Sequence, residues 1–149
     1  MSVGLPIIIV DDDPLVCEVI YEYIMRFYLW GKILPFVEPE EALIFCEKQQ
    51  TGVAIFILDV FLRNKTAFTF LDAVLPTFPM APQDTIIITG NANDEVVDMC
   101  IAADINYLLE KPIRPYALQL AIRAIVSKYV KFSKRLLLDA TFAEHVWSF

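Results

Sequence analysis

The stretch LPIIIVDDDP at residues 5–14 decides the fold of this chain. Its first part, Leu5–Val10, is apolar and rich in branched side chains, which is typical of a strand buried on both faces, as in a parallel sheet. Three aspartates end the run, and Asp13 directly before Pro14 predicts a helix start with Asp13 as its N-cap. The stretch therefore predicts a buried strand that leads through an acidic turn into a helix.

Three more short runs of this kind follow, and each ends in a polar or charged residue. They are Val53–Leu58 before Asp59, Thr85–Ile88 before Thr89, and Tyr107–Leu109 before Glu110 and Lys111. A weaker run at Lys32–Val37 contains Pro35, which a sheet accepts only on an edge strand because proline cannot donate a ladder hydrogen bond. We therefore predict buried strands at the stronger runs and an edge strand at the weaker one.

Segments in which apolar residues recur at helical spacing alternate with these runs. They lie at residues 14–27, 39–49 and 67–75, after Asn93, and from Pro115 onward. This alternation predicts an α/β fold whose parallel sheet is covered by helices on both faces. In such sheets ligands bind at the carboxyl ends of the strands, so the residues that end the runs form the candidate site.

The run-ending residues carry chemistry that fits one reaction. Asp11, Asp12 and Asp59 would repel one another without a cation, and a hard divalent ion such as Mg²⁺ prefers oxygen ligands. The hydroxyl of Thr89 and the amine of Lys111 can hold the oxygens of a phosphoryl group. Asp59 stands alone at the end of its run, and we therefore predict that it is the nucleophile.

Four motifs in this order resemble the receiver domains of two-component response regulators. They are IIIVDDDP at 7–14, FILDV at 56–60, IIITG at 86–90 and LLEKPI at 108–113. The resemblance extends from residue 5 to about residue 131. It implies a flavodoxin-like doubly wound (βα)5 fold with a five-stranded parallel sheet of order 2-1-3-4-5.

The resemblance also implies how a phosphoryl group is held. Asp59 is similar to the phosphoacceptor of the family, and Thr89 to the hydroxyl that follows the phosphoryl group. Lys111 is similar to the lysine that pairs with this group, and a cis peptide bond before Pro112 aims that lysine in the family. We therefore expect Asp59, Thr89 and Lys111 to act together.

A metal site follows from the same resemblance. Asp12 resembles a direct Mg²⁺ ligand, and Asp11 resembles its acidic partner, which acts on the ion through water. Asp59 itself and the backbone carbonyl of Phe61 would complete the set of ligands. Mg²⁺ is therefore the expected cofactor.

The chain departs from the family pattern in two places. Arg63 and Ala67 stand where proline and glycine are usual after the acceptor, so we expect the loop after Asp59 to differ in shape. Leu108 stands where an aromatic switch residue is usual, and Tyr107, one position earlier, should face the other side of the sheet. The usual threonine–aromatic switch is therefore not expected here.

The implied function is that of a signalling module without turnover of a substrate, so we do not expect an enzyme. It would take a phosphoryl group from a histidine kinase or a phosphotransfer protein, and its affinity for a partner would then change. The alternatives are a receiver fold that makes only protein contacts, a haloacid-dehalogenase-like phosphatase that uses Asp11 and Asp13, and a flavodoxin-like FMN binder. Leu15, where the phosphatase motif has threonine, and the acidic first loop argue against the last two.

The composition of the chain argues against some classes of partner and indicates the cellular compartment. The chain has 149 residues and 12 Lys+Arg against 19 Asp+Glu, a formal net charge of −7, which argues against binding to nucleic acid or an anionic membrane. Hydrophobic residues make up 57%, yet no apolar run reaches the roughly 20 residues of a membrane span, and the amino terminus does not resemble a signal peptide. Cys17, Cys46 and Cys100 fit neither a disulfide framework nor a zinc site, so we expect reduced thiols in the cytoplasm.

Residues 132–149 are the least typical part of the chain. We divide the sequence into a receiver domain at 1–131 and an apolar C-terminal helical extension at 132–149. The extension is rich in leucine and aromatic residues and contains no glycine or proline. Two interpretations stay open: a sixth helix that folds back on the domain, and a surface for a homodimer or an output partner.

Overall fold

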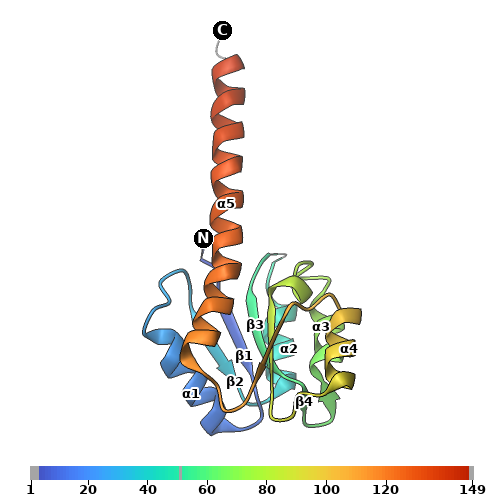
Figure 1. The fold of residues 1–149 in the computed structure, drawn as a ribbon. Coiled ribbons are helices and arrows are strands. Elements are labelled where there is room, and N and C mark those ends of the chain that lie inside the picture. Colours follow the sequence, from blue (N-terminus) through green and yellow to red (C-terminus); the bar gives the residue numbers. More distant parts are fainter. Residues whose placement is uncertain (1–3, 51, 148–149) are drawn as a thin grey trace.

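The computed structural model describes residues 4–50 and 52–147, with side chains up to residue 135. Its main sheet has five parallel strands in the order β2-β1-β3-β6-β7 (Figure 1). These strands are β1 (Ile7–Val10), β2 (Ile33–Phe36), β3 (Ile55–Asp59), β6 (Thr85–Thr89) and β7 (Tyr107–Glu110). Counted along the chain, this is the order 2-1-3-4-5, so the predicted fold class is confirmed.

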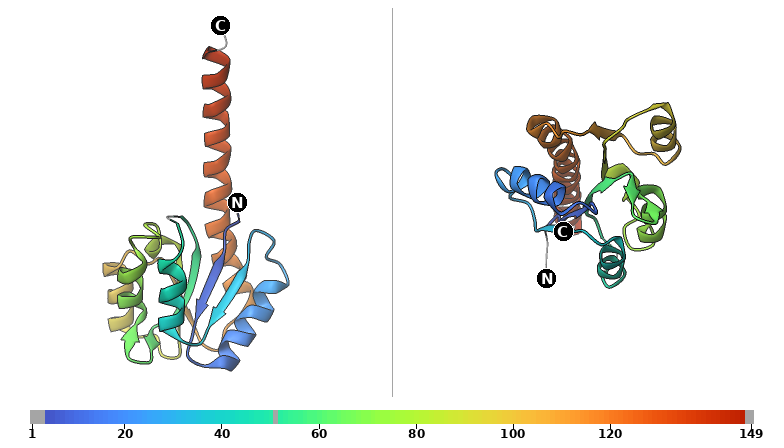
Figure 2. Two further views of the ribbon diagram at one scale, coloured as in Figure 1. Left: turned by 180° about the vertical axis from the view of Figure 1, so that it is seen from behind. Right: turned by 90° about the horizontal axis from the view of Figure 1, so that it is seen from below.

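Helices cover both faces of this sheet (Figure 2). One face carries α1 (Pro14–Met25) and α5 (Pro115–Trp147), and the other carries α2 (Pro39–Glu47), α3 (Ala67–Val74) and α4 (Asp94–Ala102). Successive strand residues point to opposite faces, so Ile8 of β1 packs under the second group of helices and Ile9 under the first. The unbroken apolar runs are thus explained, because strands between two helical layers need apolar residues on both faces.

The two predicted helix caps and the predicted edge strand are present in the structure. The Asp13 carboxylate accepts a hydrogen bond from the backbone N–H of Leu15 at 3.0 Å and caps α1. Asn93 caps α4 in the same way through the N–H of Val96, also at 3.0 Å. Pro35 lies in β2, which is an edge strand of the sheet. These predictions are confirmed.

A small antiparallel hairpin lies between β3 and α3, in a segment for which no strand is predicted from the sequence. Its strands are β4 (Phe61–Leu62) and β5 (Lys65–Thr66), and the turn between them places Arg63 at a φ of 55°. A 3-10 turn, Pro82–Asp84, precedes β6. The expectation that the loop after Asp59 differs in shape from that of the family stays a prediction.

The last helix, α5, is a single helix of 33 residues. The folded-back sixth helix is therefore wrong for residues 132–147, and the physical reason is that no glycine or proline follows Pro115 to end the helix. Figure 1 shows the second half of α5 projecting beyond the sheet, at the end where β1 begins. The domain boundary at 131 stays a prediction, and α5 crosses it without a break.

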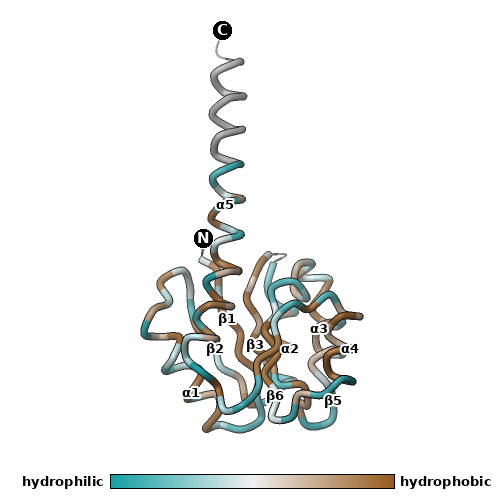
Figure 3. The backbone as a smooth tube through the Cα atoms, viewed as in Figure 1, coloured by the Kyte–Doolittle hydropathy of each residue, from teal (hydrophilic) through white to brown (hydrophobic). Residues whose placement is uncertain are grey.

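Hydropathy follows this architecture. Figure 3 shows apolar residues concentrated in the central strands and polar residues in the surrounding loops. Among the described residues, no helix is both long and apolar enough to cross a membrane.

Candidate functional site

Four strands of the sheet end at, or directly before, a polar side chain, and all four side chains lie at one edge of the sheet. Asp11 follows β1, Asp59 and Thr89 end β3 and β6, and Lys111 follows β7. Because the strands are parallel, all four residues lie at the carboxyl edge, where α/β sheets bind ligands. The structure thus brings together the residues that the sequence selected, at the end of the sheet opposite to the projecting part of α5 (Figure 1).

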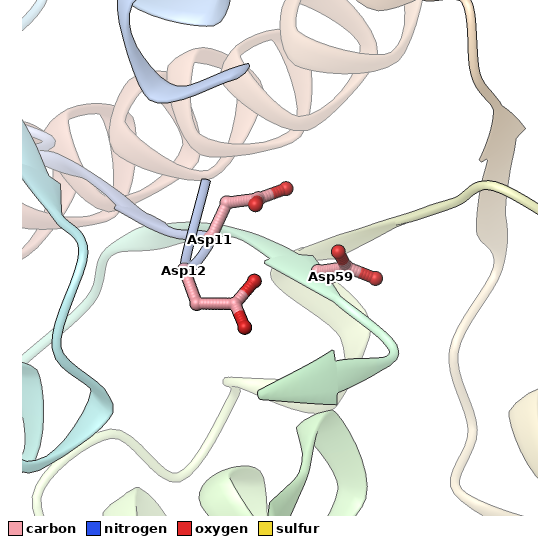
Figure 4. Close-up of side chains that lie close together, drawn as sticks. All are labelled: Asp11, Asp12 and Asp59. Atoms are coloured by element: carbon pink, nitrogen blue, oxygen red, sulfur yellow. The ribbon is translucent and has the colours of Figure 1, made fainter. Parts of the chain in front are cut away.

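Three carboxylates converge at this edge (Figure 4). Asp11, Asp12 and Asp59 each offer one oxygen, and these oxygens lie within 4.8 Å of one another. Asp11 is only 2% exposed and the Asp59 side chain 15%, so water can screen their mutual repulsion only weakly. Hard oxygen ligands at this spacing suit a divalent cation such as Mg²⁺.

Lys111 bridges two of these carboxylates. Its Nζ donates hydrogen bonds to Oδ2 of Asp11 and to Oδ2 of Asp59, each at 3.0 Å. Its backbone N–H donates to the carbonyl of Thr89 at 2.8 Å, which ties the ends of β6 and β7 together. The Lys111–Pro112 peptide bond is cis, as the sequence comparison with receivers implied.

Burial and charge act differently on the two partners of this ion pair. Burial raises the pKa of Asp11 above its ordinary value, and the hydrogen bonds from Asp13 and Lys111 offset this effect only in part. Burial lowers the pKa of Lys111, but its hydrogen bonds to Asp59 and Asp11 outweigh burial and raise it overall. The amine is therefore held in its charged form, while Asp11 is a carboxylate whose charge is costly to bury.

Asp13 does not join the acidic cluster. Its carboxylate caps α1, and its backbone N–H donates to Oδ1 of Asp11 at 2.9 Å. Asp13 therefore orients Asp11 and the first turn of the helix. This arrangement counts against the phosphatase alternative, in which Asp11 and Asp13 would both act in the reaction.

Thr89 presents its hydroxyl at the end of β6. The residue is 2% exposed, and its Oγ accepts a hydrogen bond from the backbone N–H of Asn91 at 3.2 Å. As a hydroxyl it still has a proton to donate. Thr89 is therefore placed at the same edge as Asp59, with its oxygen tied to the loop that follows β6.

A comparison with protein families decides the identity of this fold. The profile described as "Response regulator receiver domain" matches residues 7–123. The chain belongs to the receiver domain family. The matched range contains all four strand ends that build the site.

Solved receiver structures share the fold at low sequence identity. A CheY-like receiver domain protein from Methanospirillum hungatei JF-1 is 20% identical, with a TM-score of 0.72, and the match covers 86% of this chain and 98% of the other. A receiver domain protein from Clostridium thermocellum is 18% identical, with a TM-score of 0.72, covering 89% and 98%. The BeF3-activated receiver domain of DrrB is 21% identical, with a TM-score of 0.65, covering 86% and 98%. No relative was found among curated proteins.

The hairpin of β4 and β5 follows Asp59 directly in the chain. Phe61, in β4, is 66% exposed, and its backbone N–H points to Oδ1 of Asp59 at 3.4 Å. Ion pairs join the hairpin to the start of α2: Arg63 to Glu38 at 2.8 Å, and Lys65 to Glu40 at 2.5 Å. These contacts link α2 to the segment that carries the Phe61 carbonyl, which is the predicted backbone ligand.

The two residues at the switch position face opposite layers. Leu108 packs against the core under α2, α3 and α4, whereas Tyr107 packs against the core under α1 and α5. The predicted alternation is therefore confirmed. Tyr107 is on the wrong face to replace the missing aromatic residue at position 108.

One loop contact was not predicted from the sequence. The carboxylate of Glu110 accepts a hydrogen bond from the backbone N–H of Ala92 at 3.1 Å, which joins the loop after β6 to the end of β7. Glu110 directly precedes Lys111, and this position at a strand end is the signal that could have identified it. The contact holds the Thr89 loop beside the lysine.

Proposed function

We propose that this receiver accepts a phosphoryl group on Asp59 from a histidine kinase or a phosphotransfer protein. The observation that carries the proposal is the position of Lys111, 3.0 Å from both Asp11 and Asp59, beside three clustered carboxylates. An acceptor carboxylate between a fixed amine and a cation site is the arrangement that stabilises charge on a transferred phosphoryl group.

Mg²⁺ fits the residues present. Asp11, Asp12 and Asp59 would hold the ion, together with the backbone carbonyl of Phe61, because all four offer hard oxygen donors. When bound, the ion neutralises negative charge on the carboxylates and on the phosphoryl oxygens.

In this phosphoryl transfer, each side chain of the site would have a separate role. A carboxylate oxygen of Asp59 attacks phosphorus while the P–N bond to the donor imidazole breaks, and the donor nitrogen keeps the electron pair. Lys111 pairs with a phosphoryl oxygen in place of its bond to Asp59. The hydroxyl of Thr89 donates to a second oxygen. The product is an acyl phosphate on Asp59, formed without a further reactant.

The output of this modification would be a change in affinity for a partner protein. The ion pair between Lys111 and Asp59 would be replaced by a pair between Lys111 and a dianionic phosphoryl group, which would alter the loops that follow Thr89 and Lys111. The three free cysteines are all buried, which supports a reducing compartment such as the cytoplasm.

A receiver that makes protein contacts without a phosphorylation switch is the second candidate. The observation that favours it is Leu108 at the aromatic switch position, with Tyr107 on the opposite face. In that case the acidic cluster could bind Mg²⁺ without any phosphoryl transfer.

The intact mass of the full chain after incubation with acetyl phosphate and Mg²⁺ separates these candidates. We expect a gain of one phosphoryl group in the wild type and none in Asp59→Asn. Asp72→Asn is the matched control, because Asp72 is an exposed aspartate on α3, outside the site, and should still be modified. If neither acetyl phosphate nor a cognate kinase gives an adduct, the contact role is the one that remains.

A further inference from the structure

An open groove lies between helices α3 and α4, which sit side by side on one face of the sheet (Figures 1 and 2). Its volume is about 570 Å³. Most of the residues on its two walls are apolar and recur at helical spacing: Phe68, Leu71 and Leu75 on α3, and Met99 and Ala102 on α4, with Ala103 directly after them. None of the residues of the acidic site lines the groove, so it is a separate feature of the surface.

The apolar walls of the groove are partly open to water. Met99 is 36% exposed, and Phe68 and Leu75 are only half-buried. Ala102 is exposed, and its small side chain leaves the groove unfilled. Two helices that lie side by side offer a channel into which the side chains of a third helix can pack. The α3 wall, from Phe68 to Leu75, spans about 10 Å at 1.5 Å per residue, so it matches about two turns of such a helix.

The segment that builds the groove carries only negative charge. Residues 66–110 contain no lysine, arginine or histidine, and their charged residues are Asp72, Asp84, Asp94, Glu95, Asp98, Asp104 and Glu110. Asp72 and Asp104 line the groove, and Glu95 lies one turn before Met99 on the same face of α4. All three are exposed, and among the described residues no ion pair involves any of them. The rim of the groove is therefore an acidic surface that a cationic partner would complement.

We propose that the groove between α3 and α4 binds an amphipathic helix of another protein, with apolar residues on one face and lysine or arginine on its flanks. Apolar side chains of that helix, spaced three or four residues apart, would fill the groove. Its cations would pair with Asp72, Glu95 and Asp104. The same carboxylates would repel a nucleic acid or an anionic membrane, so the charge of the rim selects a basic protein segment.

The basic segment of this chain itself is not the expected occupant. Residues 123–135 of α5 carry five basic side chains, but Ile125 and Val126 within this segment already pack on their own sheet. A second copy would therefore offer the groove a helix whose main apolar face is covered. The inference does not rest on the phosphoacceptor role, because the groove contains none of the residues of the acidic site.

Fluorescence anisotropy with the full chain and a designed peptide tests the groove. The probe is a labelled helical peptide of about five turns, with leucine along one face and lysine on both flanks, and its twin carries glutamate in place of every lysine. We expect the lysine peptide to bind and the glutamate twin to bind at least about 30-fold more weakly. A lysine peptide that does not bind, or that binds no better than its twin, would overturn the proposal.

Met99→Gln tests the apolar wall, because it removes apolar surface while keeping the length of the side chain. We expect it to raise the Kd of the lysine peptide by about 5-fold or more. Met25→Gln is the matched control: Met25 is 51% exposed at the end of α1, on the other face of the sheet, and its replacement should change the Kd by less than about 2-fold. Equal effects of the two variants would refute binding in the groove.

The double variant Glu95→Gln, Asp104→Asn tests the acidic rim. Asparagine is chosen at position 104 because the backbone there has a φ of 60°, which asparagine tolerates. We expect the Kd of the lysine peptide to rise about 3-fold or more at low salt, and this difference to disappear at about 0.5 M NaCl. Glu18→Gln, Glu22→Gln removes the same charge from α1, on the other face of the sheet, and should leave the Kd nearly unchanged. If it weakens binding equally, the attraction comes from net charge and the proposed site is wrong.

Sedimentation velocity of the chain without peptide tests the remaining occupant. We expect the wild type and Met99→Gln to have the same oligomeric state. A wild-type oligomer that Met99→Gln dissociates would assign the groove to a second copy of this chain and overturn the proposal of another protein as its partner.

Discussion

Replacing Lys111 with methionine removes one amine from two carboxylates while keeping the apolar part of the side chain. The lost contacts are the 3.0 Å hydrogen bonds to Asp11 and Asp59. Asp11 is 2% exposed, so water cannot replace its partner. Breaking a buried ion pair costs about 3–5 kcal/mol, and because the Lys111 side chain is 25% exposed we expect about 2–3 kcal/mol. For a chain of this length, Tm should fall by about 4–12 °C in EDTA.

Mg²⁺ should reverse much of this loss. The ion would bring positive charge to the same carboxylates, and ligand binding stabilises the folded state in proportion to the logarithm of concentration over Kd. In the wild type the ion competes with Lys111, whereas in Lys111→Met it does not. Thermal or urea unfolding followed by circular dichroism, in EDTA and in excess Mg²⁺, should therefore show a larger Mg²⁺ gain in the variant, by at least about 1 kcal/mol.

Lys128→Met is the control for this experiment. Lys128 also pairs with a buried carboxylate, that of Asp84, which is 0% exposed and lies at the other end of the sheet. We expect this variant to lose stability too, but to gain from Mg²⁺ only as much as the wild type gains. If Mg²⁺ stabilises Lys111→Met no more than Lys128→Met, the acidic cluster is not the ion's binding site.

Three further predictions concern single side chains. Asp11→Asn should stabilise the metal-free chain by about 1 kcal/mol, measured by urea unfolding, because it removes a buried charge beside Asp59. The variant should also lose the stabilisation by Mg²⁺. A variant less stable than the wild type in EDTA contradicts this prediction. Burial raises the pKa of Cys17 to about 11 and of Cys46 to about 12, so at pH 8 a thiol reagent should label neither in the native chain, and rapid labelling would show an open core. Phe61→Ala should shorten the lifetime of the acyl phosphate several-fold, because the apolar side chain two positions after Asp59 would no longer shield the phosphoryl group from water. Intact mass in Mg²⁺ buffer measures this lifetime, and an unchanged lifetime rules out shielding.

The strands and the site could be predicted because their signals are local. Each strand is a short apolar run, and each site residue directly follows or ends such a run, so the rule for parallel sheets places Asp11, Asp59, Thr89 and Lys111 together. The N-caps of α1 and α4 are equally local. No contact between distant residues had to be known for these predictions.

The hairpin could not be predicted in this way. Its contacts with the rest of the chain include ion pairs between Arg63 and Glu38 and between Lys65 and Glu40, which join residues far apart in the sequence. Strands of two residues are too short to show an alternating pattern. The residues after Asp59 therefore show no alternation of apolar and polar side chains that would predict the hairpin.

The continuity of α5 past residue 131 was left open for a different reason. The domain boundary at 131 came from the usual length of receivers, whereas the sequence itself contains no signal that ends a helix after Pro115. The anchor of the helix, in which Lys128 and Tyr129 reach Asp84, joins positions more than 40 residues apart. Such a contact is visible only once the fold is known.

The most direct test of the central claim is to locate the phosphoryl group by chemical reduction. The chain is phosphorylated by a histidine kinase or acetyl phosphate in Mg²⁺, treated with borohydride, digested and sequenced by mass spectrometry. Borohydride converts an aspartyl phosphate to homoserine, and we predict homoserine at position 59 alone. Homoserine at position 11 or 12 instead, or at none of these positions after treatment with both donors, would contradict the assignment of Asp59 as the phosphoacceptor.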